Sequence, residues 1–443
     1  MLIIVYCGCL VCAAVLVGRR PHILLRPSFW FACIMLFVIC GAAAFTGEEI
    51  NTGFHVDSRL SSIYFFRLLT LLFPGAVFGW ILVTPGITER ARRIGRRVRV
   101  SRLLPQWGCA EWFGLAVLAV LALLILAFYL AAVPLQSSGL WAIVFEPENS
   151  VMAREHSLKL LGSPLLKYAY WMYLSVLAPL ICALVIVWPK KNLRVWLPGA
   201  GIFAVVVVGA MLSGARVIAL NICLAVAVAY VLRRGFTLGW RMLLTVFLAG
   251  SLLVAVLSAA RVGVLADFDY NLMIAYLKRD FIERAFIIPF QSGVWSNIYS
   301  QEFGLPGIAS VRPLALLMGL DWVNLPLHAA CAQPFDKPYT LSSMTSLNAC
   351  FLFNYQAAFG LVKGWGISLV LLCGLDLLLF AFSGLSGALL CAFTAALLVS
   401  LTSLLSGAYT TCLVTHGVVP IALLALLFSR IISGFMHFRA AKA

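Results

Sequence analysis

The chain has 443 residues, of which 63% are hydrophobic and only 11% are charged, and its net charge is +16. Soluble domains contain about 45 to 50% apolar and about 25% charged residues, so this composition excludes a water-soluble globular protein and indicates one that crosses a membrane several times. The positive charge does not by itself indicate nucleic-acid binding, because Lys and Arg beside apolar segments are also expected of a membrane protein.

Apolar segments of membrane-spanning length recur along the whole chain. A helix needs about 17 to 25 predominantly apolar residues to cross a hydrocarbon layer of about 30 Å. About eleven segments meet this length, which predicts an all-α polytopic integral membrane protein with a single membrane domain over residues 1–443. These predicted spans are approximately 1–18, 28–45, 63–84, 108–133, 165–188, 195–213, 216–232, 242–260, 365–383, 386–405 and 411–433.

The distribution of basic residues predicts the orientation. Arginines are concentrated in the segment 90–102. Because successive spans alternate in direction, the basic clusters at 19–26, 190–194, 233–241 and 430–442 are all predicted to lie on the same side of the membrane as this segment. Lys and Arg are enriched in cytoplasmic loops, so this side is predicted to be cytoplasmic, with the amino terminus outside and the carboxyl terminus inside. The first span has no basic residue before it and two arginines after it, which indicates a retained span rather than a cleaved signal.

Two arginines on the predicted outer side have small neighbours. Arg216 follows Ser213-Gly214-Ala215 and opens the seventh span, where backbone N–H groups and the helix dipole favour an anion such as phosphate. The alternative is an arginine that extends to the lipid headgroups. Arg261 ends the eighth span after Ser258-Ala259-Ala260, and the same two interpretations apply to it.

The segment 261–346 is the one long polar stretch, and it is predicted to form a partly helical cap outside the membrane. Residues 271–290 have helical periodicity, with apolar side chains on one side and charged ones on the other. Two ion pairs at i,i+4 spacing are either surface salt bridges of small effect, or a device that orients arginines toward a diphosphate. They are Asp280 with Arg284 and Arg279 with Glu283.

Arg312 precedes Pro313, which predicts an extended or turn conformation at the arginine. Flat rings and amides lie on both sides of it in the sequence. Such side chains stack on sugars and hydrogen-bond to them, but they are equally typical of a membrane interface. They include Trp295, Asn297, Tyr299, Gln301, Trp322, Asn324, His328 and Tyr339.

Two ionisable residues fall inside predicted spans, where such groups are costly unless they pair or line a cavity. Asp376 is expected to have a structural partner, whereas His416 lies near the outer end of its span and is a candidate for the outer site. Metal-ligand spacing is not apparent on the outer side. Its one close acidic pair in the long loop, Asp267 and Asp269, is more typical of a solvated turn than of a cation site.

Taken in order, these features resemble bacterial O-antigen and related oligosaccharide repeat-unit polymerases, whose general design the O-antigen ligases share. The resemblance covers roughly residues 140–365 and includes a polar and aromatic run after the long loop. It rests on Gly214-Ala215-Arg216, Arg261, Lys278-Arg279-Asp280 and Arg312, followed by Ser343, Thr345, Ser346, Asn348, Tyr355 and Phe359-Gly360.

The resemblance implies a GT-C-like glycosyltransferase of the bacterial inner membrane. Such an enzyme polymerises undecaprenyl-pyrophosphate-linked repeat units at the periplasmic face without a metal or other cofactor. Its donor and acceptor are both lipid-linked glycans in the bilayer, a chain-length-regulating membrane protein is a further implied partner, and nucleic acid is not one. The implied diphosphate ligands are Arg216, Arg279 and Arg312, supported by Arg261 and Arg284; Asp280, Glu283 and His416 are candidate proton acceptors; and Trp295 and Tyr299 are candidate sugar contacts.

Three other functions remain open. A ligase usually has a histidine in the long loop, and His328 is available there. A flippase or transporter would usually show internal symmetry between its halves, which we do not detect. A membrane acyltransferase would need a histidine with a partner acid, for which Asp376 and His416 are the available pair.

Overall fold

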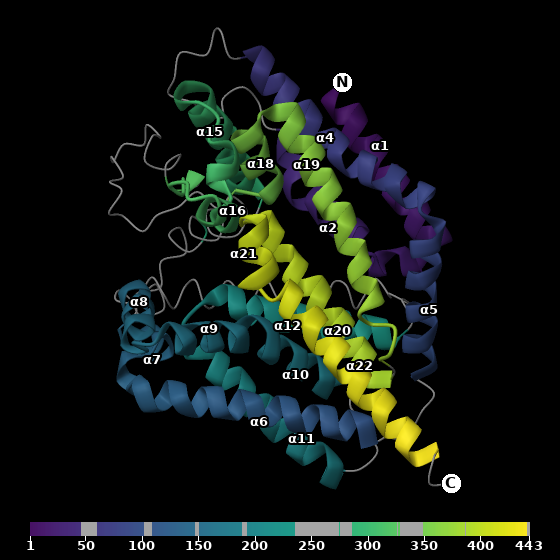
Figure 1. The fold of residues 1–443 in the computed structure, drawn as a ribbon, viewed down its shortest axis with the longest axis vertical. Helices are drawn as coiled ribbons and strands as arrows, with labels where there is room; N and C mark the ends of the chain where they lie inside the picture. The colour runs from purple at the N-terminus through teal and green to yellow at the C-terminus, as the bar shows by residue number, and fades with distance from the viewer. Residues whose placement is uncertain are drawn as a thin grey trace. The chain divides into compact units, whose positions relative to one another are not determined.

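The fold is built from helices, as the composition predicts. A computed structural model (Figure 1) describes residues 1–45, 60–101, 109–146, 150–187, 193–234, 286–325, 349–385 and 387–440, together with positions 274 and 327. Every regular element within these ranges is helical. A polypeptide crossing lipid must satisfy its backbone N–H and C=O groups internally, and a helix does so within one segment. The chain is therefore an all-α, multi-pass membrane protein.

Eight described helices are long and apolar enough to cross a membrane. Two shorter apolar helices coincide with the sixth and seventh predicted spans, whereas the predicted span 242–260 lies outside the described residues. The number eleven therefore stays a prediction. The eight helices are Leu2–Arg19, Pro27–Phe45, Ile63–Val83, Glu111–Ala132, Pro164–Ile186, Leu361–Phe380, Gly387–Leu405 and Tyr409–Ile431, and the two shorter ones are Leu197–Met211 and Val217–Arg233.

The chain forms two compact units, each assembled from segments far apart in the sequence. The first unit comprises Met1–Glu89, Ile282–Leu377 and Leu401–Cys412. The second comprises Arg90–Phe281, Leu378–Ser400 and Leu413–Ala443.

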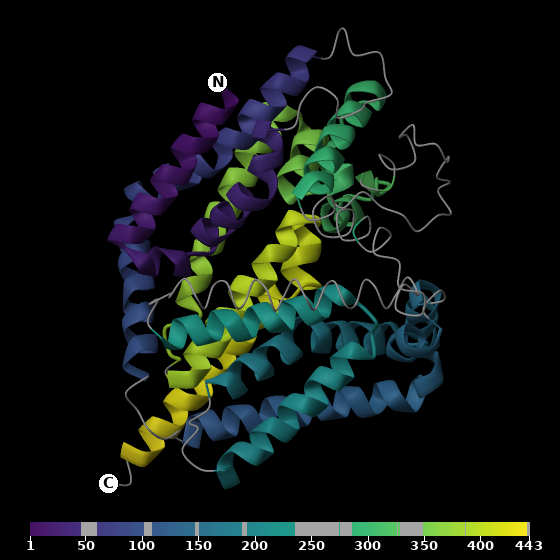
Figure 2. The same ribbon diagram turned by 180° about the vertical axis from the view of Figure 1, so that it is seen from behind.

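In the first unit, α1 lies along α4, and α19 packs against both α4 and α2 (Figures 1 and 2). Phe351 of α18 is at the centre of an aromatic cluster with Phe31, Phe73 and Tyr409. The described elements of this unit are α1 (Leu2–Arg19), η1 (Pro21–Leu25), α2 (Pro27–Met35), η2 (Leu36–Cys40), α3 (Gly41–Phe45), α4 (Leu60–Val83), the start of α5 (Pro85–Ser101), α15 (Ile288–Phe303), η7 (Gly307–Ser310), α16 (Arg312–Leu317), α18 (Phe351–Phe359), α19 (Leu361–Gly374), the start of η8 (Leu375–Phe380), η9 (Leu401–Leu405) and the start of α21 (Tyr409–Val414).

A fully buried ion pair ties the first unit together. Asp376, at the start of η8, accepts a 2.9 Å hydrogen bond from Nε of Arg26, and both side chains are completely buried. Ser28 donates to the same carboxylate through its backbone N–H and its hydroxyl, and Trp80 donates through its indole N–H. This confirms that Asp376 has a structural partner. Arg26 is one of the basic residues between the first and second predicted spans, but it is paired inside the protein rather than exposed.

The rest of the guanidinium is also satisfied. Arg26 donates 2.9 Å hydrogen bonds to the hydroxyls of Thr84 and Thr88, at the junction of α4 and α5. A buried charge is tolerated only when its partner and its remaining hydrogen bonds are supplied together. The cluster therefore fixes the start of α2, the end of α4 and the end of α19 relative to one another.

The second unit is organised around α10 (Ala178–Ile186). Residues Ala178 to Leu184 are all buried, so this helix is covered on every side, as expected of a helix that is apolar all round. It packs against α12 (Arg216–Arg233), α20 (Gly387–Ser400) and α11 (Leu193–Met211), with α12 seen clearly in Figure 2. The remaining elements are most of α5, α6 (Cys109–Ala132), η3 (Leu135–Ser137), α7 (Gly139–Phe145), α8 (Ser150–Leu160), α9 (Pro164–Met172), η5 (Tyr173–Leu177), the end of η8, the end of α21 and α22 (Val418–Ala440).

The segments between spans contain more helix than predicted. The segment 134–164, between the predicted spans 108–133 and 165–188, contains α7 and α8. Pro164 is the first residue of α9, and the side chain of the N-cap residue Ser163 makes no capping hydrogen bond. Of the predicted helix 271–290, position 274 and residues 286–290 are described. Residues 288–290 are the first residues of α15, a 16-residue helix whose continuation to Phe303 was not predicted from periodicity.

Candidate functional site

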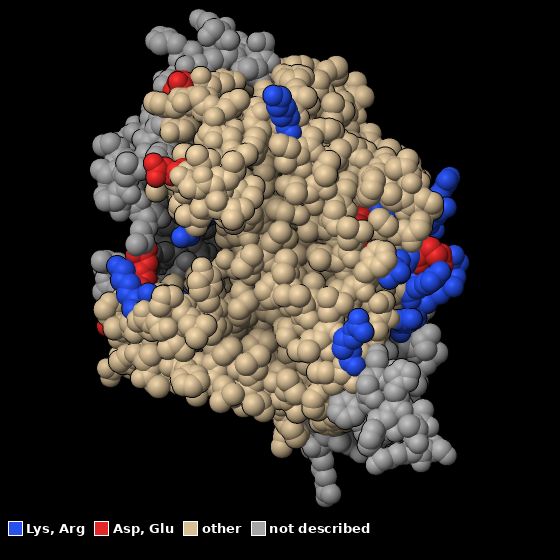
Figure 3. Space-filling view, viewed as in Figure 1, with Lys and Arg blue, Asp and Glu red and all other residues tan. Residues whose placement is uncertain are grey.

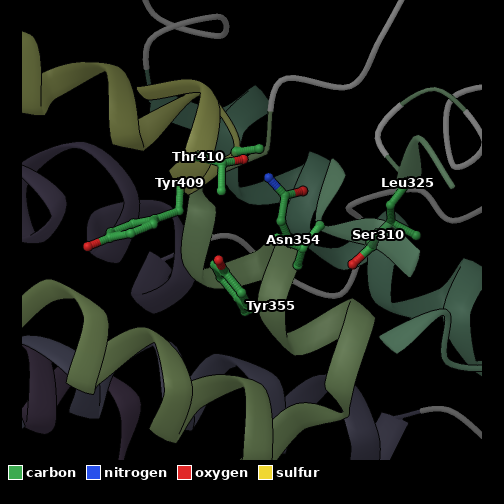
Figure 4. Close-up of a pocket in the computed structure, with 8 residues that line it drawn as sticks. Ser310, Leu325, Asn354, Tyr355, Tyr409 and Thr410 are labelled. Atoms are coloured by element: carbon green, nitrogen blue, oxygen red, sulfur yellow. The ribbon is translucent and has the colours of Figure 1, made fainter. Parts of the chain in front are cut away.

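A small cavity with a few polar groups in a mainly apolar lining lies in the first unit, where three separate segments meet. Its volume is about 40 Å³, room for ordered water or a small polar group. Figure 4 shows Asn354 between Thr410 and Ser310, whereas the ring of Tyr409 extends away from them. The lining residues are Ser310, Val311, Leu325, Asn354, Tyr355, Ala408, Tyr409 and Thr410.

The walls of the cavity are held by packing behind them. Tyr409 donates a 3.0 Å hydrogen bond from its hydroxyl to the carbonyl of Leu371 in α19. Its ring lies edge-on to that of Tyr355, with centroids 6.4 Å apart, and Tyr355 stacks on Phe359 one helical turn further along α18. The polar groups of the cavity are therefore carried by a rigid aromatic framework.

Asn354 offers the clearest binding group. Its amide nitrogen donates to the carbonyl of Ala349, but its buried Oδ1 has no hydrogen-bond donor among the described residues. A buried acceptor without a partner costs free energy, so a hydroxyl or an ordered water is expected to donate to it. Burial raises the pKa of the neighbouring Tyr355 phenol to about 12. At neutral pH this hydroxyl is therefore a hydrogen-bond donor and not a base.

Arg312 directly follows the cavity residue Val311. It is exposed, and its guanidinium carbon lies 4.9 Å from the centroid of the Trp322 ring. The prediction of an extended or turn conformation at Arg312 is wrong, because Arg312 is the first residue of α16 and the extended residue is Val311. Pro313 is tolerated in the first helical turn, where its missing N–H would have no partner in the helix. Stacking on Trp322 fixes the direction of the guanidinium, although Arg312 does not itself line the cavity.

Gly364 keeps the cavity helix α18 close to α19. A Cβ added at Gly364 would overlap the backbone carbonyl of Tyr355, so the two helices touch backbone to backbone. We expect Gly364→Ala to destabilise the protein by about 1 to 3 kcal/mol or more, because overpacking against a backbone is not relieved by side-chain rotation. Thermal unfolding of the purified protein in detergent measures this change.

Gly366 of the same helix provides the matched control. A Cβ at this position would meet nothing within 4 Å. Gly366→Ala is expected to leave the melting temperature unchanged or raise it slightly, since alanine favours a helix by about 1 kcal/mol relative to glycine. Equal melting temperatures for the two variants would show that α18 and α19 are not in backbone contact.

The turn before Arg216 is also tightly packed, in the second unit. Arg216 begins α12, as predicted. Gly214 has a positive φ of 65°, and a Cβ there would come within 2.8 Å of the Gly139 Cα. Gly139 in turn donates its N–H to the carbonyl of Leu212. The small residues before Arg216 therefore allow the backbone at Gly214 to contact the backbone at Gly139, and this contact fixes the amino end of α12. The side chain of Arg216 is outside what the structure describes.

The other predicted site residues are distributed as follows. Trp295 and Tyr299 lie on α15, half-buried, and neither lines the cavity; Tyr299 stacks on Phe303 with ring centroids 4.7 Å apart. His416 is half-buried and belongs to the second unit. Five further residues lie outside the described part of the chain, namely Arg261, Arg279, Asp280, Glu283 and Arg284.

The acyltransferase alternative requires Asp376 to act as the partner acid of His416. Asp376 belongs to the first unit and accepts hydrogen bonds from Arg26, Ser28 and Trp80. A carboxylate occupied by these donors is poorly suited to orient a catalytic histidine. Within the described ranges, no three His, Cys, Asp or Glu residues are grouped in a way that could hold a metal ion; Asp267 and Asp269 lie outside these ranges.

Sequence analysis did not identify most residues of the cavity. Tyr355 was included through the resemblance, but Ser310, Asn354, Tyr409 and Thr410 were not. One available signal was the polar run Asn354-Tyr355-Gln356 inside the otherwise apolar segment 349–359. No pattern connects that run to Ser310 or to Thr410, because they come from distant segments.

A comparison with protein-family models found no match to this chain. Comparisons with curated proteins and with solved structures found no match either.

Proposed function

We propose that the protein is a membrane glycosyltransferase that polymerises lipid-diphosphate-linked oligosaccharide repeat units on the outer face of the bacterial inner membrane. The observation that supports this most is the cavity of the first unit, whose lining residue Val311 directly precedes Arg312 in the chain. It combines the buried acceptor of Asn354 with hydroxyl groups and aromatic rings. Hydroxyls and amides are groups that bind sugar hydroxyls, and a cavity of about 40 Å³ admits one such hydroxyl rather than a whole sugar ring. The guanidinium of the neighbouring residue in the chain, Arg312, suits a diphosphate.

The proposed reaction joins two lipid-linked glycans. The acceptor hydroxyl attacks the anomeric carbon of the donor, the carbon–oxygen bond to the diphosphate breaks, and the lipid diphosphate leaves with the electron pair. Arginines stabilise the negative charge that develops on the leaving group, as positioned cations do in a cleft with little water. Arg312 is the described member of this group, and Arg216 and Arg279 are the other proposed members. Asp280 or Glu283 takes the proton of the hydroxyl in this scheme.

The length of lipid-linked glycans in cells lacking the protein tests the function. A polymerase deletion leaves single repeat units on the outer face. A missing flippase instead leaves precursors inside, and a missing acyltransferase leaves chain length unchanged. Single repeats that accumulate on the lipid carrier would support polymerisation, whereas full-length polymer on the carrier that is not transferred further would identify a ligase.

The reaction is expected to proceed without a divalent metal. The purified protein, given a lipid-diphosphate-linked repeat unit, should elongate it in EDTA and without a nucleotide sugar, because guanidinium groups are not removed by a chelator. Gel analysis of product length measures this, with a metal-dependent nucleotide-sugar transferase as the control that loses activity. Loss of elongation in EDTA that magnesium or manganese restores would assign a metal role to Asp267 and Asp269.

A further inference from the structure

Helix α5 carries an unusual concentration of positive charge. It contains six arginines and one glutamate in 17 residues. Thr88, Ala91, Ile94 and Val98 are buried and recur every three or four residues, so they form the inner face of the helix. The outer face is formed by Arg92, Arg93, Arg96 and Arg97, all of which are exposed.

The helix is fixed to the second unit by two of its arginines. The guanidinium carbon of Arg90 lies 3.7 Å from the centroid of the Phe380 ring, and Arg97 donates a hydrogen bond to the carbonyl of Ser383. These contacts hold the helix in one rotation about its axis. The outward position of Arg92, Arg93 and Arg96 therefore follows from how the helix is attached, and Arg97 remains exposed although it contacts Ser383.

Positive charge predominates on this face, and Glu89 is the one acidic residue of the helix. Arg92 and Arg96, and Arg93 and Arg97, are four residues apart, a spacing at which like charges on a helix repel each other. Figure 3 shows Lys and Arg side chains gathered along the edge where α5 lies in Figure 1. Glu89, three residues before Arg92 and four before Arg93, offsets part of this repulsion, and a nearby layer of anions would relieve the rest.

The place of α5 in the chain indicates which anion is present. The apolar helix α4 ends at Val83, and α5 begins at Pro85, so a single residue separates the arginine-rich helix from a helix of membrane-spanning length. The amino end of α5 therefore lies next to the headgroup layer, and Arg97 follows Val83 within about 21 Å of helix length. Phosphate groups of anionic lipids lie in that layer, and guanidinium groups bind phosphate with two parallel hydrogen bonds.

We propose that the face formed by Arg92, Arg93, Arg96 and Arg97 binds the headgroups of anionic phospholipids. The proposal does not depend on the reaction that the protein catalyses. It assigns to α5 a specific lipid contact in addition to the orienting effect that any cytoplasmic arginine has.

The test compares the full-length protein with two variants of equal charge. The first variant is R92Q/R93Q/R96Q/R97Q. The control, R19Q/R20Q/R234Q/R430Q, removes four exposed arginines from the ends of α1 and α12 and from within α22. Each protein is reconstituted in phosphatidylcholine nanodiscs containing increasing phosphatidylglycerol, and lipid bound to the protein after extraction is quantified by mass spectrometry.

We expect the wild-type protein and the control to retain phosphatidylglycerol in preference to phosphatidylcholine. In the α5 variant, the ratio of bound phosphatidylglycerol to bound phosphatidylcholine should be at least tenfold lower. Equal loss in the two variants would overturn the proposal, because it would show an effect of net charge alone. Unchanged preference in the α5 variant would also overturn it.

Two further measurements keep the proposal testable if the α5 variant does not fold. The preference of the wild-type protein should fall as salt is raised, because exposed charges are screened. The variant R92K/R93K/R96K/R97K, which keeps the positive charge, should keep most of the preference for phosphatidylglycerol. A salt-independent preference would contradict a headgroup contact, and equally strong displacement of the lipid by soluble polyglutamate would show a general polyanion surface instead.

Discussion

Replacing Asp376 with alanine is expected to destabilise the protein by about 3 to 5 kcal/mol, because it leaves the fully buried Arg26 guanidinium without its counter-charge. Arg26→Met should have a comparable effect, since it removes the main donor to a buried carboxylate. The amount of folded protein extracted from membranes and its melting temperature in detergent measure the loss. Both variants should be recovered at much lower yield than the wild-type protein.

The paired replacement separates the charge effect from lost packing. Arg26→Met combined with Asp376→Leu removes both charges, and exchange of a buried ion pair for apolar side chains is often neutral or stabilising. The double variant should therefore be more stable than either single variant. Arg20→Met, at an exposed position six residues before Arg26, is the control and should leave stability unchanged. Single variants as stable as the wild-type protein would contradict a buried, coupled pair.

Replacing Arg312 with alanine is expected to lower the turnover of lipid-linked repeat units by about 10²- to 10³-fold, the usual effect of removing one group that stabilises charge in a transition state. Because its side chain is exposed, the amount of folded protein should stay near the wild-type level. Lysine should restore activity only in part, since an ammonium group lacks the planar fork that binds two phosphate oxygens. Turnover is measured on purified protein normalised for folded mass.

The contact with Trp322 provides a graded check on the same site. Trp322→Leu removes the aromatic face under the guanidinium and should reduce turnover about two- to fivefold. Arg20→Ala makes the same change of charge at another exposed position and should retain full activity. If Arg312→Ala were fully active, Arg312 would have no role in catalysis, and the cavity lined by the preceding residue Val311 would lose its main link to a diphosphate.

The sequence alone was sufficient to predict the helical, membrane-spanning class of this protein. Two spans predicted at 28–45 and 63–84 correspond to Pro27–Phe45 and Ile63–Val83, because apolar length and backbone hydrogen bonding leave few other structures for such segments. It also indicated that Asp376 needs a partner. The cost of burying a charge is a property of the residue and its surroundings, so it is visible before the fold is known.

The tertiary structure alone decided which groups meet. Arg26 and Asp376 are 350 positions apart, and the cavity joins residues near 310, 354 and 409. The conformation of Arg312 was predicted incorrectly because the local preference of a residue before proline does not exclude the first turn of a helix. Periodicity and spacing describe contacts within one element, whereas contacts between distant elements depend on how helices pack and where their backbones approach, as at Gly364 and at Gly214.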